Sequence, residues 1–189
     1  MTARRSIAPF ATFVCLWTSA LAAPPPPIGE STISFQLTPP QADADEVKAR
    51  LHSIENPPPF DPSKESVTVH IPPSYTPSTP HGLLIWISPT DSPRIPNDWL
   101  EVLSKERLVF AGASRCGNPR NIFDRIRMAV TINAGIRDRI NIDGRRVYVS
   151  GFSGGGRVAS MLGVERPARR LRVGVLGERG HLCEGGNRQ

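Results

Sequence analysis

The chain has 189 residues and a formal net charge of +6 at neutral pH, but this charge is unevenly distributed. Two arginines near the N-terminus contribute +2, residues 163–189 hold six Arg against three Glu, and residues 23–162 carry only +1. This distribution excludes a nucleic-acid-binding surface, which needs Lys and Arg clustered along one element with aromatic residues beside them.

Residues 1–22 have the three parts of a secretory signal. Arg4 and Arg5 precede an apolar stretch at residues 7–21, and Ala20-Leu21-Ala22 offers small residues at the cleavage site. The apolar stretch is too short for a membrane-spanning helix, which needs about 20 residues. We therefore expect cleavage after the last of these alanines and export to the periplasm or the cell exterior, with no membrane span in the mature chain.

Proline-rich and regular segments follow one another after the signal. Residues 23–62 are rich in proline, with one short helix possible at residues 43–54, and we expect a tether or an added N-terminal cap. Apolar alternation or continuous apolar runs then predict strands at residues 66–71, 83–87, 108–113 and 147–150. Capping residues and apolar spacing predict helices that begin near Asn97, Asn118 and Gly155. Strands that alternate with helices along the chain in this way indicate an α/β fold with a mostly parallel sheet.

The sequence Gly151-Phe152-Ser153-Gly154-Gly155 stands between the last of these strands and the last helix. A serine at the tip of a strand-to-helix turn projects its hydroxyl above the sheet edge, where a substrate carbonyl can approach it. The flanking glycines leave room for a crowded backbone. The first N–H groups of the helix, at Gly154 and Gly155, point to where an oxyanion would form. Ser153 is therefore a candidate nucleophile.

Other interpretations of this glycine-rich turn remain open. A turn without a catalytic role has the same composition, and Gly154-x-Gly156-x-x-Ala159 also fits a dinucleotide-binding turn. However, nothing downstream is a convincing ribose-binding acid at the end of a second strand. A phosphate-binding loop is disfavoured, because Arg157-Val158 stands where that loop needs Lys followed by Ser or Thr.

Residues 67–163 resemble the first half of an α/β-hydrolase domain, in particular that of secreted esterases of the polyhydroxybutyrate depolymerase and feruloyl esterase type. The segments that carry the resemblance are residues 71–75, 84–88, 124–126 and, most specifically, 141–156. The resemblance implies a three-layer α/β sandwich formed by residues 63–163. It also implies cleavage of a small or polymeric carboxylic ester, without a cofactor, through an acyl-enzyme on Ser153.

The resemblance implies partners for Ser153 as well. The loop after Ile87 should supply a second oxyanion N–H, from Ser88 or Thr90, because Pro89 has no N–H. The triad acid and histidine should follow the serine along the chain. His181 is the only histidine after Ser153, and it is therefore the candidate base.

Few residues follow Ser153 to carry the acid and the base to one cleft. Glu165, Glu178 and Glu184 are the only acids there. We therefore expect a C-terminally truncated hydrolase whose later strands are missing, with an exposed sheet edge after the strand at residues 147–150. A catalytically inactive fragment or binding module is the alternative function.

The tail and the cysteines leave further alternatives open. Residues 164–189 are rich in Arg and Gly, with one strand-like stretch at residues 171–176. Either the coding sequence leaves its ancestral reading frame near Gly163, or the chain has a diverged, short C-terminus. Cys116 and Cys183 remain once the signal is removed, and they form either a disulfide, which export permits, or two unpaired thiols. The sequence contains no metal-binding motif.

Overall fold

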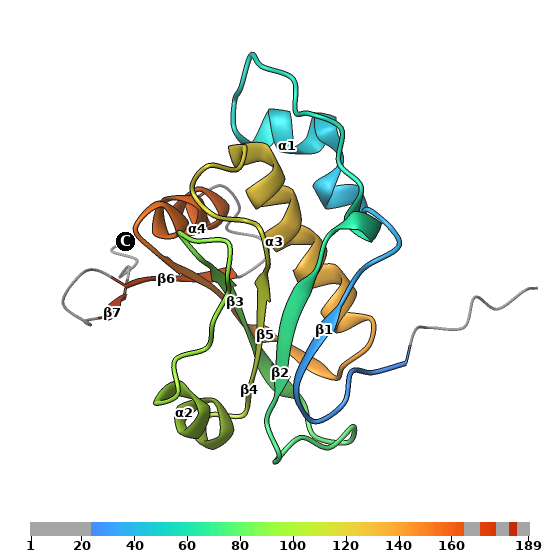
Figure 1. Ribbon diagram of the computed structural model, residues 1–189, viewed down its shortest axis with the longest axis vertical. Coiled ribbons are helices and arrows are strands. Elements are labelled where there is room, and N and C mark those ends of the chain that lie inside the picture. Colours follow the sequence, from blue (N-terminus) through green and yellow to red (C-terminus); the bar gives the residue numbers. More distant parts are fainter. Residues whose placement is uncertain (1–23, 165–170, 177–181, 185–189) are drawn as a thin grey trace, which may run out of the picture.

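Seven strands form one sheet in the part of the chain that the structure describes, and helices cover both faces (Figure 1). The computed structural model describes residues 24–164 and the backbone of residues 171–176 and 182–184. The strands are β1 (Gly29–Ile33), β2 (Val67–Ile71), β3 (His81–Ile87), β4 (Leu108–Ala113), β5 (Ile142–Phe152), β6 (Leu171–Leu176) and β7 (Leu182–Glu184). The α-helices are α1 (Ala44–Arg50), α2 (Trp99–Lys105), α3 (Ile122–Arg137) and α4 (Gly154–Val164).

The order of the strands is β1-β2-β4-β3-β5-β6-β7. The four central strands β4, β3, β5 and β6 run parallel, whereas β1, β2 and β7 pair antiparallel with their neighbours. Helices α3 and α4 contact the sheet on the side of the main core, and α2 packs beside the smaller cluster on the opposite face. The predicted α/β class, with helices on both faces of the sheet, is confirmed.

The sequence predicted an exposed sheet edge directly after the strand that precedes Ser153, and this is wrong. That strand is β5, and β6 covers its edge. It pairs in parallel with β5 from Val147 opposite Leu171 to Phe152 opposite Leu176. Strand β7 then pairs antiparallel with β6. The physical reason is that an uncovered β5 would leave a row of unpaired N–H and C=O groups, which a neighbouring apolar strand satisfies.

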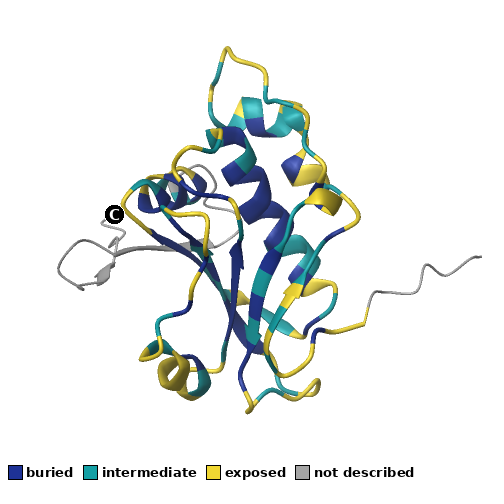
Figure 2. Cartoon of the chain, in the orientation of Figure 1, coloured by how far each residue is buried: buried dark blue, intermediate teal, exposed yellow. Residues whose placement is uncertain are grey.

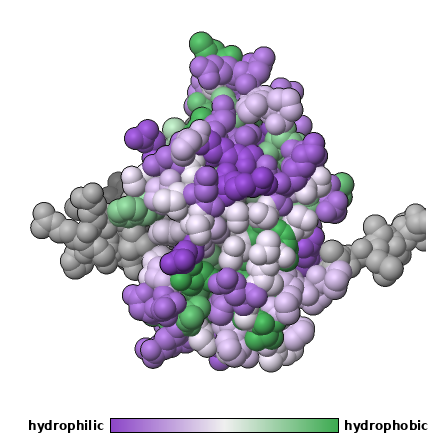
Figure 3. Space-filling model, viewed as in Figure 1, coloured by the Kyte–Doolittle hydropathy of each residue, from purple (hydrophilic) through white to green (hydrophobic). Residues whose placement is uncertain are grey.

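The main core lies between the sheet and the helices α1, α3 and α4 (Figure 2). Alternate residues of the strands point into it, as expected for a pleated strand. These buried strand residues are Val67, Val69, Ile71, Leu83, Ile85, Ile87, Val109, Ala111, Ala113, Val147 and Val149. The opposite face carries a smaller cluster around Phe110, in which Trp86 and Trp99 make an edge-to-face contact with centroids 5.2 Å apart. Figure 3 shows hydrophilic side chains over most of the upper half of one side of the molecule.

Regular structure begins earlier in the chain than the sequence predicts. Strand β1 pairs antiparallel with β2, and Phe35, Ala42 and Val47 are buried in the main core. The sequence of β1, GESTI, contains one large apolar residue and therefore lacks the usual strand pattern. The described part of the proline-rich segment thus packs on the body of the fold.

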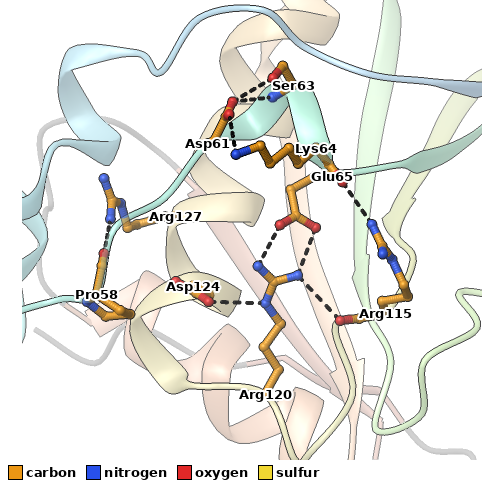
Figure 4. Close-up of polar contacts among 9 residues, drawn as sticks. All are labelled: Pro58, Asp61, Ser63, Lys64, Glu65, Arg115, Arg120, Asp124 and Arg127. Atoms are coloured by element: carbon orange, nitrogen blue, oxygen red, sulfur yellow. Dashed lines mark hydrogen bonds and ion pairs between the residues drawn. The ribbon is translucent and has the colours of Figure 1, made fainter.

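Two arginines fasten this N-terminal segment through backbone carbonyls. Arg127 of α3 is buried, and its guanidinium donates to Ala42 O at 2.7 Å and to Pro58 O at 2.9 Å, the latter contact drawn in Figure 4. Arg139, just after α3, donates to Ser34 O at 3.1 Å. Charged donors make stronger hydrogen bonds than neutral ones, so these contacts order a segment that has little regular structure of its own.

A bidentate ion pair joins the start of β2 to the start of α3. The guanidinium of Arg120 donates to both carboxylate oxygens of Glu65, at 2.6 and 2.7 Å, and to Asp124 at 3.2 Å (Figure 4). The side chains of Arg120 and Glu65 are only 19% and 11% exposed. These hydrogen bonds raise the pKa of Arg120, so the pair stays charged.

Replacing Arg120 by Met should lower the free energy of unfolding by about 3 kcal/mol, because it leaves the Glu65 carboxylate buried without its partner. Urea unfolding followed by circular dichroism measures this change. Arg145→Met is the matched control, since Arg145 is 84% exposed and pairs with Asp143 at 3.6 Å on the surface. Surface pairs contribute little, so equal losses in the two variants would contradict the role of the buried pair.

His70 on β2 should make stability depend on pH. Its Nε2 atom is buried and has no hydrogen-bond partner within the described residues. Burial lowers the pKa of His70, and the charge of Glu30 offsets this only in part. Because the unfolded chain binds the proton more readily, the stability that this group provides is complete above about pH 6.5, and it is lost as the pH falls through the lower folded-state pKa.

We therefore predict that acidification below about pH 6.5 destabilises the protein less when His70 is replaced by Gln. Unfolding free energies measured at a series of pH values give the two slopes. Identical slopes for the wild type and His70→Gln would show that His70 does not contribute.

Candidate active site

Three segments meet at the carboxyl edge of the parallel strands, where ligands bind in open α/β sheets. They are the loop after β3, the loop after β4 and the turn between β5 and α4. The first two are joined by backbone hydrogen bonds from Arg115 N–H to Asp91 O at 2.7 Å and from Asn118 N–H to Pro89 O at 2.9 Å. The Asp91 carboxylate also accepts from Gly117 N–H at 3.0 Å.

Ser153 stands exposed in the turn between β5, which ends at Phe152, and α4, which begins at Gly154. Its φ angle is +52°, a conformation that residues with a Cβ rarely adopt and that stores strain. The first hydrogen bond of α4 runs from Arg157 N–H to Ser153 O at 3.2 Å. Because the N–H groups of a helix's first turn have no partner within the helix, the N–H of Gly154 is left free to meet a ligand.

Glycines allow α4 to begin directly against the end of β3. A Cβ atom on Gly155 would overlap the carbonyl oxygen of Ile87. A Cβ atom on Gly151 would lie 2.5 Å from the carbonyl carbon of Gly155 and 2.6 Å from Ile87 O. The strand–turn–helix geometry expected of Gly-x-Ser-x-Gly is therefore present, and close backbone contacts hold Ser153 at the sheet edge.

Thr90 is engaged in a closed turn. Its N–H donates to Ser88 Oγ at 3.1 Å, and the Ser88 hydroxyl in turn donates to Ser92 O at 3.0 Å. In the observed conformation the N–H of Thr90 is thus engaged with a side chain, and its role as an oxyanion donor stays a prediction. Ser88 itself is only 4% exposed. The sequence could not show this, because the turn is closed by a serine hydroxyl two residues away.

Asn118 lies against the turn that holds Ser153. Its carboxamide packs on Gly154, so closely that a Cβ atom on that glycine would overlap Asn118 Oδ1. The sequence predicted that Asn118 caps α3, and this is wrong. The cap is Asn121, whose Oδ1 accepts from Phe123 N–H at 2.8 Å. The chain makes another turn before the helix begins, so the side chain of Asn118 does not cap α3.

Arg125 of α3 ties together the two loops that flank the turn. It is 4% exposed and donates from Nε to Cys116 O at 3.0 Å and from Nη2 to Ser88 O at 3.0 Å. Burial lowers the pKa of Arg125, but from a starting value so high that the group stays charged at neutral pH. Sequence reasoning missed this residue. The available signal was an arginine between Ile122 and Ile126 on the apolar face of a helix.

The expected base lies outside the described residues. His181 is not among them, nor are Glu165 and Glu178, and only the backbone of Glu184 is described. The structure therefore leaves the pairing of Ser153 with His181 as a prediction. The predicted signal at residues 1–22 also falls outside the described range.

Cys116 is buried and forms no disulfide within the described residues, and burial raises the pKa of its thiol to about 11. The side chain of Cys183, the other cysteine of the possible disulfide, is not described. No cluster of three metal-ligating side chains occurs within the described residues. Nor does this part of the chain contain a helix with the length and apolar character needed to cross a membrane.

The strain at Ser153 should appear as a difference between two substitutions. Ser153→Gly removes the Cβ that makes a positive φ unfavourable, whereas Ser153→Ala keeps it. We expect the glycine variant to be more stable than the alanine variant by about 1 kcal/mol in urea unfolding.

Ser160 in the interior of α4 is the matched control for this comparison. There the order should reverse, because glycine in a helix is less stable than alanine by about 1 kcal/mol. An alanine variant of Ser153 that is more stable than its glycine variant would contradict the observed turn geometry.

No protein-family model matches the sequence, and no curated protein matches it either. Solved structures match it in fold. A provisionally assigned dipeptidyl aminopeptidase IV from Bacteroides ovatus aligns with 79% of this chain at a TM-score of 0.51 and 11% identity. The fold is of the α/β-hydrolase type.

Two esterase structures align less closely. An acetyl xylan esterase from Aspergillus awamori gives a TM-score of 0.47 over 67% of this chain at 11% identity. A poly(3-hydroxybutyrate) depolymerase from Bordetella parapertussis gives 0.48 over 77% at 16% identity. The chain spans about half the length of these two proteins and a fifth of the peptidase. At such identities the likeness is one of fold.

Proposed function

We propose that the protein is a serine hydrolase that cleaves carboxylic esters through an acyl-enzyme on Ser153. The observation that carries the proposal is the exposed Ser153, held at φ +52° between β5 and the N-terminus of α4 in an α/β-hydrolase-type fold. This strained turn presents a hydroxyl and a free helix N–H to the same substrate carbonyl.

The reaction proceeds in two steps. The Oγ of Ser153 bonds to the carbonyl carbon of the ester, and the π electrons move to the carbonyl oxygen, which the N–H of Gly154 stabilises. The Oγ proton passes to a base, for which His181 is the candidate, and the alcohol leaves with a proton as the tetrahedral intermediate collapses. Water then cleaves the acyl-serine by the same route. No step requires a metal or cofactor.

The substrate class is a small or polymeric carboxylic ester, as the sequence resemblance suggests. The segment at residues 1–22 would export the protein to the periplasm or the cell exterior, where such esters are accessible. This localisation rests on the sequence pattern alone.

An inactive scaffold of the hydrolase type is the alternative function. The observation in its favour is that the N–H of Thr90 is bound to Ser88 Oγ, which leaves the loop after β3 without its expected donor. Such a protein would keep the turn and could bind a ligand there without cleaving it.

A fluorophosphonate probe and a p-nitrophenyl ester distinguish the two. The purified protein should label at Ser153 and hydrolyse the ester, and Ser153→Ala should abolish labelling and lower turnover by at least about 10³-fold. Ser160→Ala is the matched control, because Ser160 lies on α4, the helix that follows Ser153, with its hydroxyl bound to Gly156 O. This variant should leave both activities intact. A folded protein that is inert to both reagents would refute the proposal.

A further inference from the structure

We infer that the side-chain amide of Asn118 is the second oxyanion donor of this site, in place of a backbone N–H from the loop after β3. The inference rests on the proposed function and names one more of its catalytic residues. Its starting point is a shortage of donors. An oxyanion is stabilised by hydrogen-bond donors about 2.7–3.1 Å away, and removing one donor from such a pair costs about 10²–10³-fold in rate.

The N–H groups that the sequence singled out in the loop after β3 are poorly placed for this role in the observed conformation. Pro89 lacks an N–H, Thr90 donates its own to Ser88 Oγ, and Ser88 is buried. A second donor beside the N–H of Gly154 can instead come from another segment. Of the segments at this edge of the sheet, the loop after β4 approaches Gly154 directly, through Asn118.

The backbone at Asn118 is firmly held. Its N–H donates to Pro89 O at 2.9 Å, and the preceding Gly117 donates to the Asp91 carboxylate at 3.0 Å. Arg125 fixes the carbonyl of Cys116 one residue earlier, at 3.0 Å. A side chain on such a support is positioned for a ligand before the ligand arrives, which is what oxyanion stabilisation requires.

The carboxamide of Asn118 is free to donate. It is exposed, and no hydrogen bond within the described residues involves its oxygen or its nitrogen. Rotation about the Cβ–Cγ bond exchanges the two ends of this group, so either can face Gly154. An amide nitrogen carries two N–H donors. The Asn118 side chain can thus place an N–H beside that of Gly154.

The run of three glycines after Ser153 fits this contact. Gly155 is explained by its contact with the carbonyl of Ile87, whereas a side chain on Gly154 would collide with Asn118 and with no other group closer than 3.1 Å. The absence of a Cβ at Gly154 therefore lets the Asn118 carboxamide pack directly on the residue that carries the first N–H of α4. A structural role for Asn118 alone would not require this approach to the residue after Ser153.

In the reaction, the carbonyl oxygen of the ester gains negative charge as Ser153 Oγ bonds to the carbon. It then accepts hydrogen bonds from Gly154 N–H and from Asn118 Nδ2–H. No proton is transferred to or from the amide, so this contribution adds no ionisation to the pH profile. Asn118 should act on kcat rather than KM, because the bond strengthens in the transition state.

The test compares Asn118→Ala and Asn118→Asp with the wild type, using kcat and KM for a p-nitrophenyl ester and the rate of fluorophosphonate labelling at Ser153. Both variants should lose about 10²–10³-fold in kcat, with KM and the alkaline pH profile of the alanine variant unchanged. The aspartate is isosteric but carries no donor at neutral pH and repels the oxyanion. Asn97→Ala, at an exposed asparagine before α2, is the matched control and should match the wild type.

Each outcome supports or overturns the inference. Labelling and turnover by Asn118→Ala and Asn118→Asp within twofold of the wild type would overturn it and leave the proposed function standing. A wild-type protein that neither labels at Ser153 nor turns over would refute the proposed function and the inference together. If Asn118→Ala does not fold, the isosteric aspartate decides, with its thermal unfolding showing that the loop is intact.

Discussion

The contact between Gly155 and the carbonyl oxygen of Ile87 is the constraint on which the site depends. It lets α4 begin against the end of β3, and the chain then has a single residue, Ser153, in which to turn from strand to helix. The positive φ of Ser153 follows from this short connection. Any side chain at Gly155 would move the helix away from the sheet, and the hydroxyl and the free N–H of Gly154 would lose their common direction. The strain at Ser153 is maintained because the surrounding strands are paired on both sides of β5.

Two buried arginines of α3 hold irregular parts of the chain in place. Arg125 and Arg127 are close together on α3, yet each holds a different part of the chain through carbonyl oxygens. Arg125 holds the two loops beside the turn, and Arg127 holds the N-terminal segment. A cation is costly to bury, and the hydrogen bonds to carbonyls offset that cost. Loops that carry chemistry can therefore remain irregular and still be fixed in place.

What could be foreseen from the sequence was local. The central strands and helices are encoded by the spacing of apolar residues that are close together in the sequence. The turn at Ser153 is likewise encoded by the glycines next to it. Strand β1 was missed because its burial comes from pairing with β2, and its own sequence is polar. The engagement of Thr90 and the contact of Asn118 with Gly154 depend on loops that meet only in the folded chain. The wrong cap for α3 has a similar cause, since Asn118 and Asn121 both precede an apolar helix and only the path of the chain decides between them.

A crystal structure of the protein after reaction with a fluorophosphonate tests the central claim most directly. The account predicts a phosphonyl group on Ser153 Oγ, with its P=O oxygen within hydrogen-bond distance of Gly154 N–H, where the oxyanion of an ester would lie. The φ angle of Ser153 should remain positive. An adduct on another residue, or a phosphonyl oxygen on Ser153 that points to solvent away from the N-terminus of α4, would contradict it.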